Sequence, residues 1–172
     1  MRQRDLALWG NDIMKVLVMS DTHGYIINAK EAIDKNSDIE MVLHLGDYCR
    51  DAAQLSQLYP NIKFEYVYGN CDIGIGAISG EKTIEIEGRR IFMTHGHKYS
   101  VKWDYNRILA KAEMDKAEVI LFGHTHVAVI DSSSDVLILN PGSISESRSN
   151  SPESYAILEI SEDNIKTDIY YL

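Results

Sequence analysis

The histidines of this chain all lie within or next to short polar motifs that end apolar runs. The chain has six of them: His23, His44, His95, His97, His124 and His126. Four oxygen-bearing side chains stand in the same motifs: Asp21, Asp47, Asn70 and Asp72. Mixed imidazole and carboxylate sets are typical ligands of Mn²⁺, iron and Zn²⁺, whereas a shortage of cysteine disfavours iron–sulfur clusters and structural zinc. The residue types therefore predict a divalent metal centre.

The number of candidate ligands predicts more than one ion. A single catalytic metal usually takes about three protein ligands and keeps one position open. This sequence offers more than twice that number: Asp21, His23, Asp47, Asn70, His95, His124 and His126. Two ions that share a carboxylate can clamp the attacking and leaving oxygens of an in-line displacement at phosphorus. The chemistry that fits is the hydrolysis of a phosphoester.

Apolar runs of strand length precede these motifs and predict buried strands. The runs begin at Val16, Met41, Phe64, Ile91, Val119 and Val136. Binding sites in open α/β sheets form outside the carboxyl ends of the strands, so we expect the polar motifs to converge on one rim. His124 and His126 are two positions apart, and in an extended segment this spacing places both side chains on one face.

Helical periodicity appears in three segments, at residues 25–35, 50–58 and roughly 100–116. Ser100 is expected to be the N-cap of the third helix. The stretch from Lys82 to His95 predicts a hairpin that turns at Gly88. Two alternating segments near the end of the chain predict antiparallel strands, at residues 155–160 and 165–171. Strands that alternate with helices predict an α/β fold.

Length and composition bound the class of protein. With 172 residues, of which 45% are hydrophobic, we expect a single domain over residues 1–172, with residues 1–13 as an N-terminal extension. No apolar run approaches the roughly 20 residues of a membrane-spanning helix. The net charge of −9 and the lack of a Lys/Arg cluster disfavour general nucleic-acid binding. Cys49 and Cys71 cannot build a disulfide framework, so a cytoplasmic location fits best.

The ordered motifs DTHG, GD, GNCD, THGH and GHTH resemble those of the calcineurin-like metallophosphoesterase superfamily, and the resemblance covers residues 14–143. The short length and the GNCD and NPGS variants are most similar to the small YfcE-type phosphodiesterases, whose relatives include the eukaryotic Vps29 proteins. The resemblance implies a four-layer αββα sandwich with two mixed central sheets. It implies a metal-dependent phosphoesterase, first of all a phosphodiesterase. A phosphomonoesterase of the same mechanism and a Vps29-like, non-catalytic interaction scaffold are the alternatives.

The resemblance also implies how the ligands are divided between two ions. The implied sets are Asp21, His23 and His126 for the first ion, Asn70, His95 and His124 for the second, and Asp47 as the bridge. A hydroxide shared by the two ions would be the nucleophile. Mn²⁺ is the first candidate, with Fe, Zn²⁺, Ni²⁺ and Co²⁺ as the others. The expected partner is a small phosphoester, with no membrane, and self-association into a homo-oligomer is an expectation at the level of the family.

One motif departs from the larger phosphatases of the superfamily, in which GN is followed by histidine and glutamate. Here Cys71 and Asp72 occupy those places. A neutral thiol donates a weaker hydrogen bond than imidazolium and helps an alkoxide leave less well. We therefore expect a preference for good leaving groups, or a general acid from elsewhere, for which His97 is a candidate. Asn70 is also a candidate substrate contact.

Several of these residues have an ordinary structural alternative. His44 is expected to pack or to orient a ligand from behind. His97 either contacts substrate or holds the THGH turn by a hydrogen bond. Asp72 either meets substrate or orients its own turn. Arg148 could bind a phosphate oxygen as a fork, or could lie in solvent on the polar surface loop that begins at Ser145.

Overall fold

Five of the predicted strands form the first sheet of the fold. The structure is a computed structural model that describes residues 13–74, 76–146, 148 and 151–172. The first sheet has the order β10-β9-β1-β2-β3, with β1 at Met14–Met19, β2 at Met41–His44, β3 at Lys63–Tyr66, β9 at Ser154–Ile160 and β10 at Ile165–Tyr171. β1, β2 and β3 run parallel, whereas β9 is antiparallel to both of its neighbours. The predicted antiparallel strands at the end of the chain are confirmed.

The second sheet has the order β4-β5-β6-β8-β7. Its strands are β4 at Glu81–Ile86, β5 at Arg89–Thr94, β6 at Val119–Leu121, β7 at Ala128–Asp131 and β8 at Leu137–Pro141. β4 and β5 form the predicted hairpin around Gly88, and β5, β6 and β8 run parallel. β7 was not predicted. It is a short edge strand without fully buried residues, so it lacks the apolar run that marks the central strands.

Three α-helices connect the strands, at the places that the periodicity predicts. They are α1 at Ile27–Lys35, α2 at Cys49–Leu58 and α3 at Asn106–Asp115. The prediction that Ser100 caps the third helix is wrong. Ser100 ends a short 3₁₀ helix, η1 at His97–Tyr99, and has a left-handed φ of 57°. The carboxylate of Asp104 instead accepts a hydrogen bond from the N–H of Asn106, at 2.8 Å, where α3 begins.

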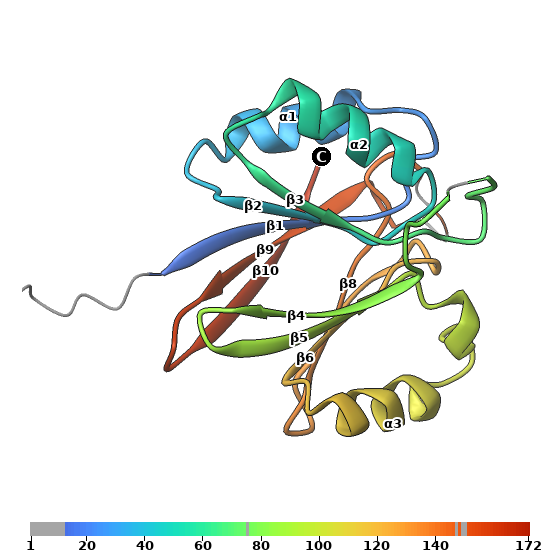
Figure 1. Cartoon of the computed structure of the whole chain (residues 1–172), viewed down its shortest axis with the longest axis vertical. Coiled ribbons are helices and arrows are strands. Elements are labelled where there is room, and N and C mark those ends of the chain that lie inside the picture. The colour runs from blue at the N-terminus through green and yellow to red at the C-terminus, as the bar shows by residue number, and fades with distance from the viewer. Residues whose placement is uncertain (1–12, 75, 147, 149–150) are drawn as a thin grey trace, which may run out of the picture.

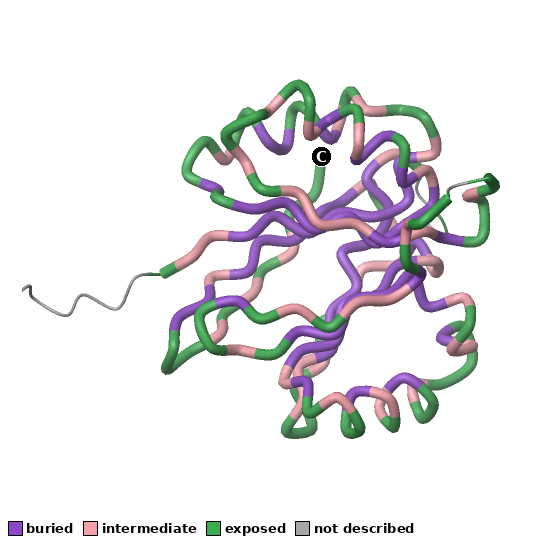
Figure 2. The backbone as a smooth tube through the Cα atoms, viewed as in Figure 1, coloured by how far each residue is buried: buried purple, intermediate pink, exposed green. Residues whose placement is uncertain are grey.

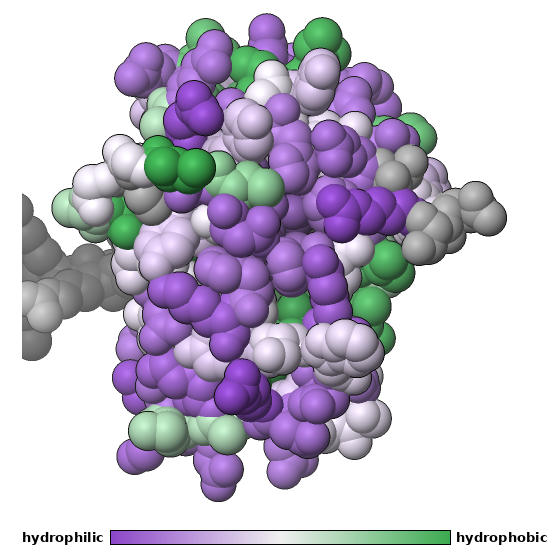
Figure 3. Space-filling view, turned by 90° about the vertical axis from the view of Figure 1, so that its right-hand side faces the viewer, coloured by the Kyte–Doolittle hydropathy of each residue, from purple (hydrophilic) through white to green (hydrophobic). Residues whose placement is uncertain are grey.

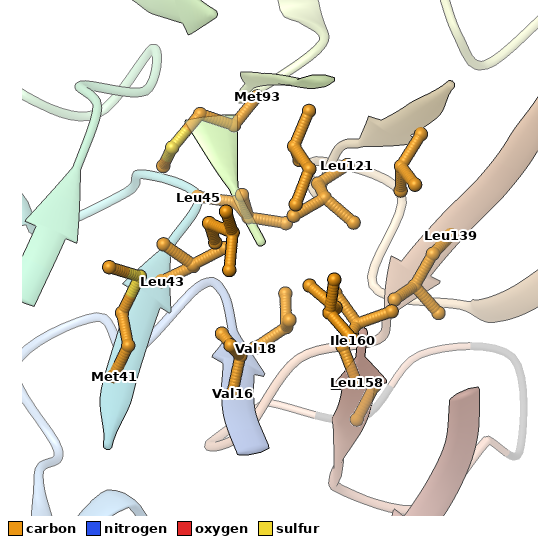
Figure 4. Close-up of a cluster of buried hydrophobic side chains, with 14 of the residues drawn as sticks. Val16, Val18, Met41, Leu43, Leu45, Met93, Leu121, Leu139, Leu158 and Ile160 are labelled. Carbon is orange, nitrogen blue, oxygen red and sulfur yellow. The ribbon is translucent and has the colours of Figure 1, made fainter. Parts of the chain in front are cut away.

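The two sheets pack face to face, with helices on both outer sides (Figure 1). α1 and α2 cover the first sheet, and α3 covers the second. Between the sheets, Val18, Leu43 and Ile160 face Met93 and Leu121 (Figure 4). All five side chains are fully buried. The central strands are buried, whereas the edge strands and the outer sides of the helices are partly or fully exposed (Figure 2). The predicted four-layer αββα sandwich with two mixed sheets is confirmed.

The parallel strands of both sheets end on the same side of the molecule, at the right of Figure 1. The loops that follow them carry the polar motifs. This face is turned toward the viewer in Figure 3, where hydrophilic residues dominate its centre. Within the described part of the chain, no helix has the length and the apolar character needed to cross a membrane.

Candidate metal centre

The loops that carry the predicted ligands have a strained backbone. Five of the seven ligands have a φ in the left-handed region: Asp21 at 58°, His23 at 46°, Asp47 at 54°, His124 at 69° and His126 at 60°. This conformation costs a non-glycine residue roughly 1–2 kcal/mol, and such residues cluster at functional sites. β6 ends at Leu121. His124 and His126 therefore lie beyond the strand and both have a left-handed backbone, which sets the direction of their side chains. The prediction that they belong to an extended segment is wrong.

Hydrogen bonds between loops that are distant in sequence hold this backbone in place. The Asp21 N–H donates to the Gly46 carbonyl at 3.0 Å, and the Gly123 N–H donates to the His95 carbonyl at 3.1 Å. The Ser145 hydroxyl lies 2.9 Å from the carbonyl oxygen of Asp21 and 2.8 Å from that of Thr22. These bonds fasten the first loop to the last one. Surrounding structure of this kind is what allows strained residues to persist.

Two glycines allow the carboxylates to approach the backbone closely. A Cβ atom on Gly69 would lie 2.1 Å from Oδ1 of Asp47. A Cβ atom on Gly123 would lie 2.0 Å from Oγ of Ser20 and 2.8 Å from Oδ2 of Asp21. A real side chain cannot occupy either position without a shift of its neighbours. The GNCD and GHTH motifs therefore need their glycines for packing against the two aspartates.

The first ligand group consists of Asp21, His23 and His126, which each offer an atom within 4.8 Å of the others. His126 Nε2 lies 3.0 Å from Oδ1 of Asp21 and 3.3 Å from Nε2 of His23. Oδ1 of Asp21 is buried, and despite the short distance to His126 it accepts no hydrogen bond of good geometry from any described residue. A buried carboxylate oxygen without a donor fits a cation as its partner.

The orientation of the His126 ring strengthens this assignment. Nδ1 of His126 lies 3.0 Å from the carbonyl oxygen of Glu146 and must donate to it, because a carbonyl can only accept. In the neutral ring, Nε2 then presents a lone pair toward His23 and Asp21. A hydrogen bond from Nδ1 to a carbonyl is the usual outer partner of a metal-binding histidine. His126 is thus held in the form that binds a metal.

A second candidate group consists of Asp21, Asp47 and His95, and a third consists of His23, Asp47 and Cys71. Nδ1 of His95 lies 2.9 Å from the carbonyl oxygen of Leu45, to which it donates. Nε2 of His95 faces acceptors: Oδ1 of Asn70 at 3.1 Å, Oδ2 of Asp47 at 3.4 Å and Oδ1 of Asp21 at 4.0 Å. A nitrogen surrounded by oxygens in this way needs a positive charge, either a proton or a metal ion. His95 is fully buried, which makes that charge all the more necessary.

Asn70 and His124 complete the second group of ligands. Nδ2 of Asn70 donates to Sγ of Cys71 at 3.3 Å, which leaves Oδ1 directed toward His95. The rings of His124 and His95 lie 5.0 Å apart between centroids. Burial, together with the positive charge of His95, lowers the pKa of His124 to about 4. At neutral pH the His124 imidazole is therefore uncharged, as a metal ligand must be.

Both aspartates of the centre stay ionised at neutral pH. Burial opposes the charge of Asp47, but hydrogen bonding and charge from His95, with the Cys71 N–H, hold the pKa of this carboxyl well below its usual range. Burial opposes the charge of Asp21 as well, and His126 and His95 outweigh it and lower its pKa. Two buried, negatively charged carboxylates in one site attract cations strongly.

The residues present therefore fit divalent metal, because Oδ1 of Asp21 is buried without a hydrogen-bond donor and Nε2 of His95 is surrounded by oxygen acceptors. The profile of the calcineurin-like phosphoesterase superfamily domain matches residues 14–163 of this sequence. The chain belongs to this superfamily. The predicted membership is confirmed, and with it the metal-dependent class of phosphoesterase.

Individual members of the superfamily are similar over most of the chain. The probable metallophosphoesterase YsnB of Bacillus subtilis is 32% identical over 159 residues, which cover 91% of this chain and 90% of that protein. A phosphodiesterase of Methanocaldococcus jannaschii is 28% identical over 151 residues, which cover 75% of this chain and 83% of that protein. A Vps29 structure with Zn²⁺ from Entamoeba histolytica has a TM-score of 0.75 at 21% identity, over 92% of this chain and 99% of that one. The last likeness shows the fold alone.

His44 lies behind the predicted metal ligands rather than among them. It is fully buried, its Nδ1 accepts a hydrogen bond from the Gly46 N–H at 3.2 Å, and its Nε2 lies 3.1 Å from the Thr22 hydroxyl. Burial lowers the pKa of His44 to about 4, so the ring is neutral. The expected packing and orienting role agrees with these contacts, because Thr22 and Gly46 flank Asp21 and Asp47 in the chain.

This chain departs from the larger superfamily phosphatases at Cys71 and Asp72. The surroundings of these two residues differ from each other. Burial and the nearby carboxylate of Asp47 raise the pKa of the Cys71 thiol to about 11, so the thiol is neutral at pH 7. Asp72 accepts hydrogen bonds from the N–H groups of Cys49 and Gly69, both at 2.8 Å. Asp72 thus ties the turn to the start of α2, in line with its predicted turn-orienting role.

Of the two remaining predicted site residues, His97 lies beside the predicted ligands and Arg148 does not contact them. The His97 ring lies 5.4 Å from that of His95 and 6.2 Å from that of His124, between centroids. Its Nδ1 is buried and has no hydrogen-bond partner among the described residues, so that atom does not hold the THGH turn. Arg148 is exposed, and its side chain makes no contact with the predicted ligands in the described parts of the chain.

Two residues at the centre were missed by the sequence-based reasoning. Oε2 of Glu146 lies 3.9 Å from Nε2 of His23, and the ring of Tyr48 packs edge-on against His23 at 5.6 Å between centroids. The polar segment from Ser145 was expected to be a surface loop, and Glu146 is indeed exposed, but the prediction missed that Ser145 and Glu146 also border the predicted centre. Their signal was the NPGS motif directly before them, which holds the loop against Asp21 through Ser143.

Proposed function

We propose that this protein hydrolyses a phosphodiester with the help of two divalent metal ions. The position of Asp47 is the observation that carries the proposal. Its Oδ2 lies 3.9 Å from Nε2 of His23 and 3.4 Å from Nε2 of His95, so that this carboxylate stands between two groups of ligands. A shared carboxylate is the hallmark of the two-metal arrangement that stabilises in-line displacement at phosphorus.

The proposed ligand sets are those that the resemblance to the superfamily implies, and the group Asp21, His23 and His126 supports the first of them. They are Asp21, His23 and His126 for the first ion, Asn70, His95 and His124 for the second, and Asp47 as the bridge. When bound, the ions supply a nucleophilic water of lowered pKa and the positive charge that the phosphoryl oxygens require. The role of the protein is to hold the Nε2 atoms of His95 and His126 inward through the carbonyls of Leu45 and Glu146. Mn²⁺ is the first ion to test, before Fe, Zn²⁺, Ni²⁺ and Co²⁺.

Stabilisation of the leaving oxygen is the weak point of the proposed site. The Cys71 thiol is neutral and donates poorly. Burial, together with the charges of His95 and Lys98, lowers the pKa of His97, so at pH 7 this ring is mostly uncharged. We propose that His97 donates a neutral N–H to the leaving oxygen, with Cys71 and Asp72 shaping that side of the site. The enzyme would then favour esters with good leaving groups.

Substrate binding in this proposal uses groups at the border of the metal rim. Asn70 is exposed and directs Oδ1 toward His95, and we propose that its amide group also contacts a phosphoryl oxygen of the substrate. Arg148 is an exposed cation on the loop that also provides Glu146. Its guanidinium could bind a phosphate oxygen in a bidentate manner. The substrate is proposed to be small, and the cytoplasm to be the place of action, since Cys49 and Cys71 are both free thiols.

The choice of a diester over a monoester rests on the relative from Methanocaldococcus jannaschii, which is named a phosphodiesterase. The direct test starts from chelator-treated protein. This preparation should not hydrolyse bis(4-nitrophenyl) phosphate, and addition of Mn²⁺ should restore turnover. 4-Nitrophenyl phosphate, assayed in parallel, should turn over more slowly. The reverse order would assign a phosphomonoesterase of the same mechanism.

A non-catalytic scaffold is the second candidate, because the Zn²⁺-bound Vps29 structure shares the fold. The two candidates differ in what the metal rim does. A scaffold would bind metal without turnover. Failure to hydrolyse either aryl ester with any of the five metals named above, in protein shown to contain metal, would favour the scaffold and reject the enzyme.

A further inference from the structure

The last strand leaves a long and regular edge on the first sheet. β10 has seven residues, whereas the edge strands β3 and β7 have four each and β4 has six. In the described part of the chain β9 is its only sheet neighbour, and the register between them is continuous (Figure 1). Soluble proteins normally protect such edges by proline, bulges or short strands, because free edges pair with other chains. β10 has no proline or bulge and is not short, and its only protection is a pair of exposed charges of opposite sign, Lys166 and Asp168.

Hydrogen bonds at both ends of the hairpin show which backbone groups face outward. Ser161 and Asn164 exchange N–H···O bonds of 2.9 and 3.3 Å, and the Leu172 N–H donates to the Glu153 carbonyl at 3.0 Å. In antiparallel pairs, hydrogen-bonded and non-bonded positions alternate. The even-numbered residues of β10 therefore bond to β9. Ile165, Thr167 and Ile169 direct their N–H and C=O groups to the free edge.

Three polar side chains in the middle of β10 have no hydrogen-bond or ion-pair partner within the described residues, whereas Tyr170 stacks on Tyr155 and the two isoleucines pack against the core. Lys166 and Asp168 are exposed on one face, and neither forms an ion pair with a residue in the described ranges. Thr167 points to the other face, where its hydroxyl oxygen is buried and lacks a hydrogen-bond partner within the described chain. A buried hydroxyl without a partner is destabilising, and such groups are rare in folded proteins.

We propose that β10 is the dimerisation edge of this protein and pairs antiparallel with β10 of a second copy, with the two-fold axis at Thr167. Thr167 then lies opposite Thr167 of the partner subunit, and the two hydroxyls can bond to each other. Lys166 lies opposite Asp168 of the partner subunit, and the symmetry makes this ion pair twice. Thr–Thr and opposite-charge pairs are the cross-strand pairs that stabilise antiparallel sheets.

The charges of Lys166 and Asp168 favour the register with its axis at Thr167 over the registers shifted by one or two residues. An axis at residue 166 or 168 would place two lysines or two aspartates directly opposite each other, which is destabilising. An axis at residue 165 would place Asp168 opposite Glu162, again with like charges. An axis at residue 169 would pair Asp168 with Tyr170 and make no ion pair. The axis at Thr167 alone makes two ion pairs and satisfies the buried hydroxyl.

The space beside the edge is compatible with a second copy. A hollow of about 360 Å³ lies next to β10, lined by residues that include Ile130, Leu137, Ile165 and Thr167. The register places Ile169 of the partner subunit opposite Ile165, at the mouth of this hollow. Pairing of one strand buries less surface than a standard interface, so the dimer should dissociate on dilution.

Charge reversal tests the proposal without reference to catalysis. The molar mass of the whole chain is measured by sedimentation equilibrium over a concentration series, and the native protein should dimerise. Lys166→Asp and Asp168→Lys should each weaken the dimer roughly tenfold or more, because each puts two like-charge pairs across the axis. Lys30→Asp, the same charge change on the exposed face of α1, should have no effect.

Mixing the variants gives the decisive result. Lys166→Asp protein and Asp168→Lys protein, each mainly monomeric alone, should form a heterodimer when mixed, since all four charges are then opposite. The double variant should dimerise with itself for the same reason. A native chain that stays monomeric overturns the proposal. A dimer that is unaffected by either reversal, or variants that do not recover when mixed, overturns it as well.

Discussion

Nε2 of His23 lies 3.3 Å from Nε2 of His126, and the ring of His126 donates its Nδ1 proton to the Glu146 carbonyl. The two facing nitrogens can share one proton or one metal ion, but two bare lone pairs at this distance would repel. His95 has the same need, because its Nε2 faces oxygen acceptors. His95 is therefore the residue of this centre whose Nε2 needs either a proton or a metal ion.

Metal binding should release protons from this centre. Burial lowers the pKa of His95, but the carboxylates of Asp47 and Asp21 outweigh burial and raise it above the ordinary value of 6.5. Near pH 6.5 most of this residue is protonated in the metal-free protein, so metal affinity should fall as the pH is lowered through that range. Calorimetric titration with Mn²⁺ in buffers of different ionisation enthalpy measures the protons released. No release at pH 6.5 would contradict the assignment of His95.

Replacement of the bridging carboxylate should separate metal binding from folding. In Asp47→Asn the amide oxygen can still accept the Cys71 N–H, which the carboxylate does at 2.8 Å. We expect loss of the second ion and a decrease in turnover of more than about 100-fold, since even an outer partner of a ligand is worth about 10–100-fold. Metal content per chain and the rate on bis(4-nitrophenyl) phosphate check this. Two retained ions with full turnover would exclude Asp47 as the bridge.

The glycine of the GNCD motif should be needed for the position of Asp47. In Gly69→Ala the new methyl group would meet Oδ1 of Asp47, and the carboxylate must move. We expect loss of turnover with a native-like circular dichroism spectrum. Gly74→Ala is the matched control, because a Cβ there meets nothing within 4 Å. The positive φ at position 74 should make this variant less stable by roughly 1 kcal/mol. The turnover of the variant should stay near that of the native protein.

A stronger donor at position 71 should help poor leaving groups. Cys71→His places an imidazole where the neutral thiol is, next to Asp47, whose charge favours the protonated ring. General acid catalysis by histidine contributes roughly 10²–10⁴-fold in favourable cases. We expect the gain in kcat to be larger for an alkyl aryl diester with the poorer leaving group than for bis(4-nitrophenyl) phosphate. Equal rates for the native protein and the variant would refute the explanation of this departure.

The stability of the metal-free protein should fall in mild acid because of His44. Its pKa is about 4 in the fold and near 6.5 in the unfolded chain, so between these values the unfolded state binds more protons. The contribution of His44 to the free energy of unfolding is therefore fully present above pH 6.5. It decreases by about 3 kcal/mol as the pH falls toward 4. Urea unfolding at pH 7.5 and pH 4.5 measures the difference. In His44→Gln, which keeps a donor and an acceptor, that difference should shrink by a similar amount.

Much of the centre could be predicted because its chemistry is local. Each ligand follows an apolar run within a few residues, and the order DTHG, GD, GNCD, THGH and GHTH is a property of the chain. Buried parallel strands need such apolar runs, and binding sites form at their carboxyl ends. The strands, the α/β class and the rim therefore followed from pattern alone. β7 did not, because a half-exposed edge strand lacks this pattern.

Errors arose where local preference and tertiary context disagree. Ser100 is a good capping residue by type, but its left-handed φ and the 3₁₀ turn before it exclude that role. His124 and His126 have the spacing of a strand face, yet their positive φ values show that the strand has already ended. Glu146 is exposed, as its serine-rich segment predicts, but the contact of its carbonyl with His126 joins two loops 20 positions apart and has no signal in the local sequence.

The sequence by itself determined which atoms are available to a metal and the order in which they occur. Only the tertiary structure decided that His23 and His126, 103 positions apart, have facing nitrogens, and that Asp47 stands between two groups of imidazoles. Convergence depends on strand order and sheet packing, which are set by contacts between distant segments. The tautomers of His95 and His126 were decided in the same way, because each is set by a carbonyl from another loop.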